Sequence, residues 1–517
     1  MTSRRIFLRA LAGLAVGAAV VVPTVTRPRF VGNPFRLGVA SGYPTPDSVV
    51  LWTRLVVDPR VPDGGIDPVA IPVHWEIARD EAMRYVVRSG VAAATPEWAH
   101  SVHVVADGLE PSRWYWYRFA VGDSQSAVGR TRTAPATEVM PASLRFVVAS
   151  CQHYELGFFG AWRHVVADAP DLVVFLGDYI YEGSVTWAAP RKHRAPSPHT
   201  LAEYRLRYAL YRSDPDLAAA HAACPWILTW DDHEVSNDYA ADRPDNGMPR
   251  DAFLARRAAA YRAYYEHMPL PPWMRPEGPA MRIYTTLDWG PLARFAILDG
   301  RQYRSVQACL GEGQTGGSNT VDVDACDELQ DPRRTMLGFE QERWLEATLA
   351  ASPARWNLIA QQTPLARIDQ QIGSGVSVWT DGWDGYPAAR QRLLDFLARQ
   401  RIMNPVTLAG DVHMFVVSDL KADFDDPASP VVASELCGTS ITSGAWPQET
   451  VERVLPENPH IRFANSAYRG YLRMELTPKR LRADLRAMDS VRTPDGRCRT
   501  LASFVVADGR PGPRRVE

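Results

Sequence analysis

The sequence predicts a protein in two parts, an all-β region followed by a larger α/β domain built in layers. Two patterns predict this arrangement. Short strand-like runs separated by turn signals fill residues 31–138, and from residue 139 onward apolar strands alternate with long helical segments. The chain has 517 residues, too many for one small core, and its hydrophobic content of 46% is typical of a well-packed globular protein.

The N-terminus has the pattern of an export signal. Arg4 and Arg5 precede an apolar, small-residue stretch over residues 11–22, which is too short for a comfortable membrane span. We therefore expect residues 1–30 to be a twin-arginine signal peptide, read by the twin-arginine export machinery, and the mature protein to be secreted. A simple N-terminal anchor or a basic tail is the alternative interpretation.

Export makes disulfides possible among the six cysteines. Cys309 and Cys326 flank a loop rich in Gly and Asp and are the favoured pair, whereas a bond between Cys437 and Cys498 is a guess, since connectivity cannot be read from sequence. The formal net charge is -2, and no run rich in Lys or Arg follows the N-terminus. The charge therefore argues against a nucleic-acid partner.

Five runs in the first region are rich in β-branched and aromatic residues, as strands are. They lie at 48–55, 73–79, 85–94, 101–109 and 115–122. Their spacing, with turn signals between them, predicts a β-sandwich of immunoglobulin or fibronectin type over residues 31–138. Residues 133–143 have the composition of a linker.

The second region, 139–517, alternates strands and helices. Continuous apolar runs predict strands that are covered on both faces, at 144–150, 171–178, 225–232, 293–301, 355–362 and 404–413. Helices are expected at 157–168, 199–212, 251–268, 339–352 and 388–401. Two more strand-like runs lie at 471–478 and 480–489, and the Pro- and Arg-rich end after them is expected to fray.

Each of the six apolar strands ends in residues whose side chains can bind a ligand or take part in catalysis. These are Ser150-Cys151, Gly177-Asp178, Asp231-Asp232-His233, Asp299-Gly300-Arg301, Gln361-Gln362 and Asp411-Val412-His413. An aspartate after a strand is most often a cap or turn residue. In layered α/β folds, however, ligands bind beyond the carboxyl ends of the strands, so six such endings together predict one site.

The carboxylates of this site predict bound cations. Clustered carboxylates repel one another and raise each other's pKa, and a cation removes that repulsion. Hard cations such as Ca²⁺, Mg²⁺ or Fe³⁺ prefer oxygen ligands. Two cations that share a bridging carboxylate can activate a water and stabilise a phosphoryl transition state.

Four blocks carry a resemblance to a known family. Residues 177–181 (GDYIY), 231–234 (DDHE), 410–413 (GDVH) and 150–154 (SCQHY) stand where metallophosphoesterases carry their ligand motifs. Together with the twin-arginine signal and the opening of the β-region at 33–55, this set resembles the alkaline phosphatase D (PhoD-like) family, which includes iron- and calcium-dependent bacterial phospholipase D enzymes. The resemblance implies an α/β metallophosphoesterase-like layered sandwich behind an N-terminal all-β domain.

The resemblance also implies a role for each matching residue. One Fe³⁺ would be bound by Cys151, Asp178 and Tyr181. One or two Ca²⁺ would be held by Asp178, Asp231 or Asp232, Asn237, Asp411 and His413. His233 would contact the phosphate or protonate the leaving oxygen, and Arg301 would clamp phosphate oxygens. Cys151 departs from the usual Asp or His ligand, and Gln362 stands where a histidine is usual, which favours calcium over a softer two-metal site.

Several of these residues have a structural alternative. Cys151 can be a buried small hydrophobe, Tyr181 can simply pack while Tyr179 is the polar one, and His413 can be a core histidine. Arg301 can be an ordinary salt-bridge partner. The remaining histidines that we considered are expected on loops or helix surfaces, namely His153, His164, His193 and His199.

These patterns predict a secreted metal-dependent phosphoester hydrolase that acts on phosphomonoesters or phosphodiesters with a metal-activated water. The alternative within the same chemistry is a phospholipase D that acts on phospholipids and makes transient contact with a membrane surface. An aromatic, glycine-punctuated segment at 378–387 is expected to line the substrate cleft. The non-enzymatic alternative is a cell-envelope binding protein that calcium stabilises.

Overall fold

The structure, a computed structural model, describes residues 29–245 and 247–516. The twin-arginine signal peptide expected over residues 1–30 therefore lies almost wholly outside the described residues and stays a prediction. Within the described ranges, no helix combines the length and the apolar character that a membrane crossing requires.

The molecule is built around two large β-sheets. The first has ten strands in the order β24 (Arg510–Arg515), β23 (Cys498–Ala507), β22 (Arg480–Met488), β21 (Arg469–Leu476), β9 (Leu144–Ala149), β10 (Leu172–Phe175), β11 (Pro225–Leu228), β1 (Val39–Gly42), β2 (Val49–Arg54) and β5 (Ser101–Ala106). The second has seven, in the order β12 (Thr285–Trp289), β13 (Ala293–Ile297), β15 (Trp356–Ala360), β17 (Pro405–Ala409), β19 (Val431–Cys437), β18 (Phe415–Lys421) and β20 (Ile461–Asn465).

The central strands are the six apolar runs predicted from sequence. β9, β10 and β11 are parallel neighbours in one sheet, and β13, β15 and β17 are parallel neighbours in the other. Their side chains form one continuous core, in which the rings of Phe146 and Phe295 meet edge to face at 5.5 Å. Every residue of β10, β15 and β17 is buried, which explains why these strands have no polar alternation.

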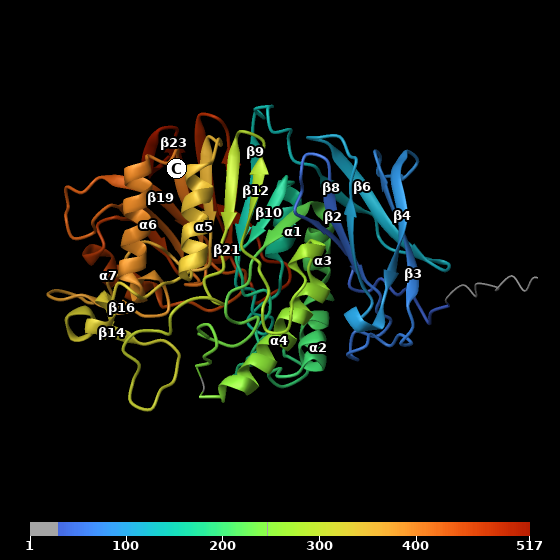
Figure 1. Cartoon of the computed structure of the whole chain (residues 1–517), viewed down its shortest axis with the longest axis horizontal. Helices are drawn as coiled ribbons and strands as arrows, with labels where there is room; N and C mark the ends of the chain where they lie inside the picture. The colour runs from blue at the N-terminus through green and yellow to red at the C-terminus, as the bar shows by residue number, and fades with distance from the viewer. Residues whose placement is uncertain (1–28, 246, 517) are drawn as a thin grey trace, which may run out of the picture.

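Helices cover the outer faces of this two-sheet core (Figure 1). On the side of the ten-stranded sheet lie α1 (Ala161–Asp168), α2 (Leu201–Arg212), α3 (Pro215–Ala223) and α4 (Arg250–His267). On the side of the seven-stranded sheet lie α5 (Phe339–Ala350) and α6 (Pro387–Gln400), which share a second core with Ile359 and Leu298. The five helices predicted from sequence are confirmed, and the described chain also contains α3 and α7 (Gln448–Val454), which were not predicted.

Shorter elements complete the described chain. These are α7 (Gln448–Val454), the strand pair β14 (Thr320–Asp322) and β16 (Ser377–Trp379), and the 3-10 helices η1 (Pro96–Trp98), η2 (Pro272–Met274), η3 (Val323–Ala325), η4 (Asp327–Gln330), η5 (Trp383–Gly385) and η6 (Leu455–Glu457).

The N-terminal region is a sandwich that shares a sheet with the rest of the chain. Its separate layer has β4 (Val86–Ala94), β3 (Ile71–Ala78), β6 (Trp114–Val121) and β7 (Ser124–Gln125), with β8 (Gly129–Arg132) also paired to β6. This layer packs on β1, β2 and β5 through its own apolar core. β1 in turn pairs with β11, where Ser41 lies opposite Pro225. The ten-stranded sheet thus contains strands from both sides of the domain boundary predicted at residue 138.

Two expectations about the chain end and the cysteines are wrong. The end of the chain does not fray, because β23 and β24 add to the ten-stranded sheet and Phe504 is buried there. Cys437 and Cys498 do not pair: both are free cysteines, Cys437 at the end of β19 in one sheet and Cys498 at the start of β23 in the other. The favoured pair, Cys309 with Cys326, is confirmed as a disulfide.

Candidate metal centre

The residues that follow β9, β10, β11 and β17 meet at one place. Ligand atoms of Cys151, Asp178 and His413 lie within 4.8 Å of one another, and the same holds for the carboxylates of Asp178, Asp231, Asp232 and Asp411. Asp178 belongs to both groups, and also to a third with Asp232 and His233. The carboxyl-terminal edges of the two sheets thus bring together the predicted ligands from four strands.

Several of these residues have unusual backbone conformations, which direct their side chains toward the cluster. Cys151, Asp178, Asp411 and His413 have φ values of 60°, 57°, 64° and 57°, in the left-handed region that non-glycine residues rarely adopt. Gly177, with φ of 110°, has no room for a side chain, because a Cβ there would lie 2.4 Å from the amide nitrogen of Asp231. Such strain persists where surrounding structure enforces it, and it clusters at functional sites.

Three buried carboxylate oxygens in the cluster lack a hydrogen-bond partner among the described residues. They are Oδ1 of Asp178, Oδ2 of Asp231 and Oδ2 of Asp411. Burial is the main reason that the pKa of each of these carboxyl groups is raised, and neighbouring carboxylates raise it further. Unpaired buried oxygens are costly, so this donor set fits a hard cation.

Tyr181 lies on the cysteine side of the cluster. Its hydroxyl donates to Oδ2 of Asp178 at 2.7 Å, accepts from Ser443 at 2.7 Å and lies 3.1 Å from Nε2 of His413. Burial raises the pKa of both Tyr181 and Cys151 well above the usual range, with Asp178 adding to the effect. Tyr179 points elsewhere, into the core, where its hydroxyl lies 2.9 Å from Nε2 of His221.

His233 is held from one side by a carboxylate. Its Nδ1 lies 2.7 Å from Oε2 of Glu182, and its ring centroid is 4.1 Å from that of Tyr181. Burial acts to lower the pKa of His233, but Glu182, Asp232 and Asp178 together raise it well above its usual value. Glu182 is absent from the sequence-based site, although it directly follows Tyr181, the last residue of a block that carried the resemblance.

Comparisons with known proteins agree with this geometry. Residues 146–485 match the family described as PhoD-like phosphatase, and residues 21–135 match the PhoD-like phosphatase N-terminal domain. The chain belongs to the PhoD-like phosphatase family. It is 45% identical over 519 residues to alkaline phosphatase D of Bacillus subtilis (strain 168), which covers 98% of this chain and 87% of that protein.

A solved structure described as that of PhoD has the same fold. It shares 46% sequence identity with this PhoD-like phosphatase, covers 95% of this chain and 93% of its own, and superposes with a TM-score of 0.90. Membership of the family makes the chain an enzyme of the phosphatase type, which argues against the calcium-stabilised binding protein.

Asp231 and Asp232 occupy different surroundings in this PhoD-like phosphatase. Asp231 is ion-paired through Oδ1 with the guanidinium of Arg301. Asp232 accepts the backbone N–H of His233 at 2.9 Å and that of Asp238 at 2.7 Å, so it also closes the local turn. Burial acts to raise the pKa of Asp232, but Arg301 and His233 bring it below its usual value. Both aspartates remain candidates for a cation ligand.

Arg301 is buried behind the cluster. Its guanidinium pairs with Asp231 and, at 2.6 Å, with Asp381, and its side chain is 0% exposed. One of its nitrogens lies 3.7 Å from Asp411. Arg301 is not among the residues that line the cavity described below. These contacts are those of the salt-bridge alternative, and the phosphate-clamping role stays a prediction.

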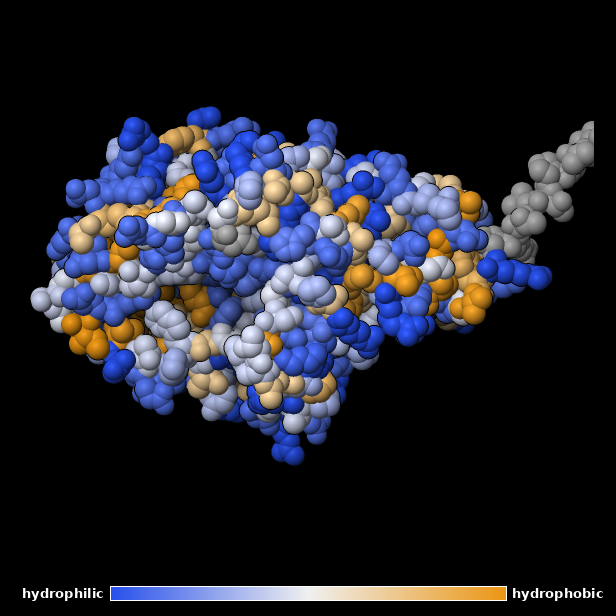
Figure 2. Space-filling view, turned by 90° about the horizontal axis from the view of Figure 1, so that it is seen from below, coloured by the Kyte–Doolittle hydropathy of each residue, from blue (hydrophilic) through white to orange (hydrophobic). Residues whose placement is uncertain are grey.

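A cavity of about 510 Å³ opens over the cluster. Asp178, Asp232, His233 and Asp411 lie on its polar side, and Asn237 lines it too, with its backbone N–H bonded to Glu182 at 2.8 Å. Apolar residues also line the cavity, among them Trp379, Trp383, Trp446, Ile368 and Met414. Figure 2 shows a hollow in this face of the molecule with hydrophobic residues inside it. The aromatic segment 378–387 thus lines the cavity as expected.

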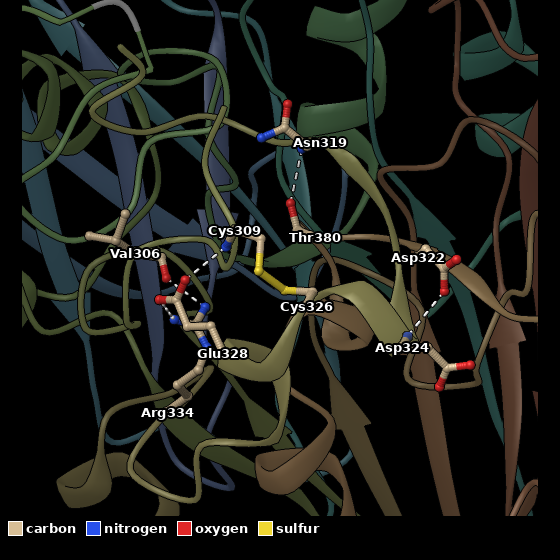
Figure 3. Close-up of a disulfide and its surroundings, with 9 residues drawn as sticks. All are labelled: Val306, Cys309, Asn319, Asp322, Asp324, Cys326, Glu328, Arg334 and Thr380. Atoms are coloured by element: carbon tan, nitrogen blue, oxygen red, sulfur yellow. Dashed lines mark hydrogen bonds and ion pairs between the residues drawn. A yellow bond between two sulfur atoms is a disulfide. The ribbon is translucent and has the colours of Figure 1, made fainter. Parts of the chain in front are cut away.

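The disulfide closes a loop that forms another part of the wall. Cys309 and Cys326 bracket Ser318, Asn319 and Thr320, which line the cavity. Figure 3 shows this bond and the contact, 2.9 Å long, that the backbone N–H of Asn319 makes with Oγ1 of Thr380. Ser318 also bonds the carboxylate of Asp238, which the sequence-based site missed.

One histidine assigned to the surface lies beside the site. His153 is only 7% exposed, and its ring centroid is 4.5 Å from that of Tyr181. It follows Cys151 by two positions in the quoted block, a signal that sequence reasoning did not use. His193 stacks behind it, at 5.5 Å between ring centroids.

Proposed function

We propose that this PhoD-like phosphatase is a secreted, metal-dependent hydrolase of phosphomonoesters or phosphodiesters. One observation supports it above the others: buried oxygens of Asp178, Asp231 and Asp411 converge without partners at the base of a cavity that His233 also lines. A structural cation site needs neither a histidine beside it nor an open cavity above it.

The residues present fit the cations that the family resemblance implies. Cys151, Asp178 and Tyr181 would hold one Fe³⁺, because thiolate and phenolate are anionic ligands that a ferric ion accepts. One or two Ca²⁺ would be held by Asp178, Asp231 or Asp232, Asn237, Asp411 and His413. Bound cations would supply the positive charge that activates water and stabilises a phosphoryl transition state.

The chain's own residues would orient the ester and supply the proton that the leaving oxygen takes up. Glu182 engages Nδ1 of His233, which leaves Nε2 as the nitrogen available to the cavity. From there a protonated His233 can donate to the leaving alkoxide oxygen. No Lys or Arg is found among the described residues that line the cavity, so His233 is the protein's own cationic group there.

The cavity wall bears on the choice of ester. Trp379, Trp446 and Ile368 give part of the cavity wall an apolar character suited to the alcohol part of a substrate. This wall favours a diester with an apolar or extended alcohol over a small monoester. The phospholipase D alternative, with transient contact at a membrane surface, fits the same wall.

The test joins metal analysis with turnover on one purified sample. Inductively coupled plasma mass spectrometry should find iron and calcium, and a visible absorption band should report Cys151 and Tyr181 on iron. Asp178→Ala should lose both metals and at least 10³-fold in kcat, as expected when transition-state charge stabilisation is removed. The matched control is Asp251→Ala, whose side chain is 97% exposed.

The outcomes separate the alternatives. Full turnover by a metal-stripped Asp178→Ala protein would end the proposal. Zinc or manganese without a visible band would remove the iron assignment but keep the hydrolase. Rates on p-nitrophenyl phosphate, bis(p-nitrophenyl) phosphate and phosphatidylcholine vesicles then rank monoester, diester and phospholipid.

A further inference from the structure

A second, larger hollow lies away from the metal centre. Its volume is about 880 Å³, against about 510 Å³ for the cavity over the carboxylates. It forms where the N-terminal region meets α2, the start of α3 and the segment from Arg191 to Ala195. None of the proposed metal ligands lines it.

Arginines dominate the polar lining of this hollow. The charged residues around it are Arg36, Arg60, Arg191, Arg194, Arg207, Asp58, Asp214 and Asp216. All three aspartates already have arginine partners, since Asp58 pairs with Arg60, Asp214 with Arg191, and Asp216 with Arg163 outside the hollow. Across the described chain no carboxylate pairs with the remaining three arginines, so the hollow carries an excess of positive charge.

The guanidinium of Arg191 is held in place by several contacts, but one of its nitrogens has no hydrogen-bond partner among the described residues. Its Nε donates to the carbonyl of Tyr154 at 2.9 Å and its Nη1 to Asp214 at 2.7 Å. The guanidinium also stacks on the ring of Tyr154, 3.8 Å from the centroid, and on that of Phe159 at 4.3 Å. Its Nη2 is buried without a hydrogen-bond partner among the described residues, in a side chain that is only 10% exposed. A buried N–H donor of this kind needs an acceptor oxygen.

Arg207 adds charge from the floor of the hollow. It is 2% exposed and donates only to backbone carbonyls, those of Tyr181, Glu182, Ala195 and Pro196. Its positive charge is therefore not neutralised by any of these bonds. Arg36 and Arg194 are exposed and line the hollow, and the bond that Arg36 makes there is to a neutral group, the carbonyl of Val57 at 3.3 Å.

We propose that this hollow binds a phosphate-bearing organic anion at a site separate from the metal centre. The guanidinium group of arginine can donate two parallel hydrogen bonds to the oxygens of one phosphate. Binding of a phosphate group therefore accounts for the excess of arginines. A volume of about 880 Å³ is far more than one phosphate ion fills and lies in the range of sites for organic ligands. Phe158, Leu206, Leu210 and Pro215 line the same hollow and suit the ligand's organic part.

Two sources can supply this chemistry. One is an organic phosphate such as a further unit of a phosphoester substrate, and the other is free inorganic phosphate. The apolar lining favours the organic source. Phenylphosphonate, which resists hydrolysis, serves as its probe, inorganic phosphate as the probe of the second source, and benzoate as an anion of similar shape without phosphorus.

The test counts ligands bound per chain by equilibrium dialysis on the metal-loaded enzyme. Arg36→Ala/Arg194→Ala removes the two exposed lining arginines that pair with no carboxylate, and Arg343→Ala/Arg510→Ala removes two exposed arginines elsewhere as the matched control. The Arg36→Ala/Arg194→Ala variant should bind one phenylphosphonate fewer per chain than wild type, or bind that molecule at least 10-fold more weakly, as loss of about 1.4 kcal/mol of contacts implies. The control should match wild type.

Binding at the metal centre is followed separately as competitive inhibition of turnover, which the Arg36→Ala/Arg194→Ala variant should leave unchanged. Equal stoichiometry and affinity in wild type and in this variant would overturn the proposal, as would benzoate binding as tightly as phenylphosphonate. If inorganic phosphate bound more tightly than phenylphosphonate, the proposal that the ligand is an organic phosphate would be overturned. The experiment does not depend on the phosphoester substrate, so its failure leaves the hydrolase proposal intact.

Discussion

Nδ1 of His233 lies 2.7 Å from Oε2 of Glu182, and this contact determines which ring nitrogen is available to the cavity. The other oxygen of Glu182 accepts the backbone N–H of Asn237 at 2.8 Å, so the carboxylate is itself held in place. Glu182 thus connects the histidine to the segment that carries Asn237. It is a positioning residue, since it acts on the reaction through His233.

Glu182→Gln should lower kcat about 10- to 100-fold with little change in KM, the size of effect seen when a carboxylate that orients a histidine is removed. An amide holds His233 with a weaker bond and offers only one acceptor oxygen. Steady-state kinetics and metal content should be measured on the same protein, with the exposed Glu452→Gln as control. An unchanged kcat, or a loss that tracks loss of metal, would contradict the positioning role.

Arg301→Ala should destabilise the fold by about 3–5 kcal/mol, because it leaves the buried carboxylate of Asp231 without its partner and that of Asp381 with Arg304 as its only remaining arginine. Denaturant unfolding checks this, and Arg301→Lys should recover only part of the loss because lysine lacks the fork. Arg333→Ala, at a side chain that is 86% exposed, should change little. A variant of normal stability with only a raised KM would instead favour the phosphate clamp.

Cys309→Ser/Cys326→Ser should lower the midpoint of thermal unfolding, since closing a loop over a separation of 17 residues is worth about 3 kcal/mol in the chain-entropy account. The loop also carries Ser318, Asn319 and Thr320 on the cavity wall. We therefore expect KM to rise more than kcat falls. A variant with wild-type KM would show that the wall keeps its shape without the bond.

Glu435 should make stability depend on pH between pH 4 and 8. It is buried in β19 and accepts the backbone N–H groups of Leu365 and Ala366 at 2.6 Å and 2.9 Å. Burial raises the pKa of Glu435 from 4.5 to about 7, so its contribution to stability is present below pH 4.5 and is lost as the pH rises through 7.

Glu435→Gln removes this titration. The free energy of unfolding of the variant, relative to wild type, should therefore rise between pH 4 and 8 by an amount on the order of 3 kcal/mol. Denaturant midpoints at several pH values measure it, with the exposed Glu452→Gln as the control. A flat difference for Glu435→Gln would show that folding does not raise the pKa of this carboxyl.

The central fold was predictable because its signals are local. Runs such as the Leu-Val-Val-Phe of β10 have no polar alternation, and this alone marks strands covered on both faces. The ligand set followed from position, since Asp178 and Asp411 directly succeed such strands. Parallel strands then bring their carboxyl ends to one edge without further information from the sequence.

What escaped prediction depends on contacts between distant segments. Asp381 reads as one more acidic residue in an aromatic loop, and only the packed structure places it against Arg301 and Arg304. Glu182 was missed for the same reason, because its partner His233 is 51 residues away. The short apolar run in β23 lies between segments rich in Arg and Pro, so a paired strand was taken for a frayed end.

The pairing of β1 with β11 has a consequence for how the enzyme can be divided. Cleavage of the backbone within 133–143 would leave two fragments that share main-chain hydrogen bonds and the side-chain packing beside them. Expression of residues 139–517 alone would instead uncover the edge of β11. The unpaired backbone groups of that edge could then pair with a strand of another chain. The N-terminal region thus covers a strand edge that would otherwise be open to pairing with another chain.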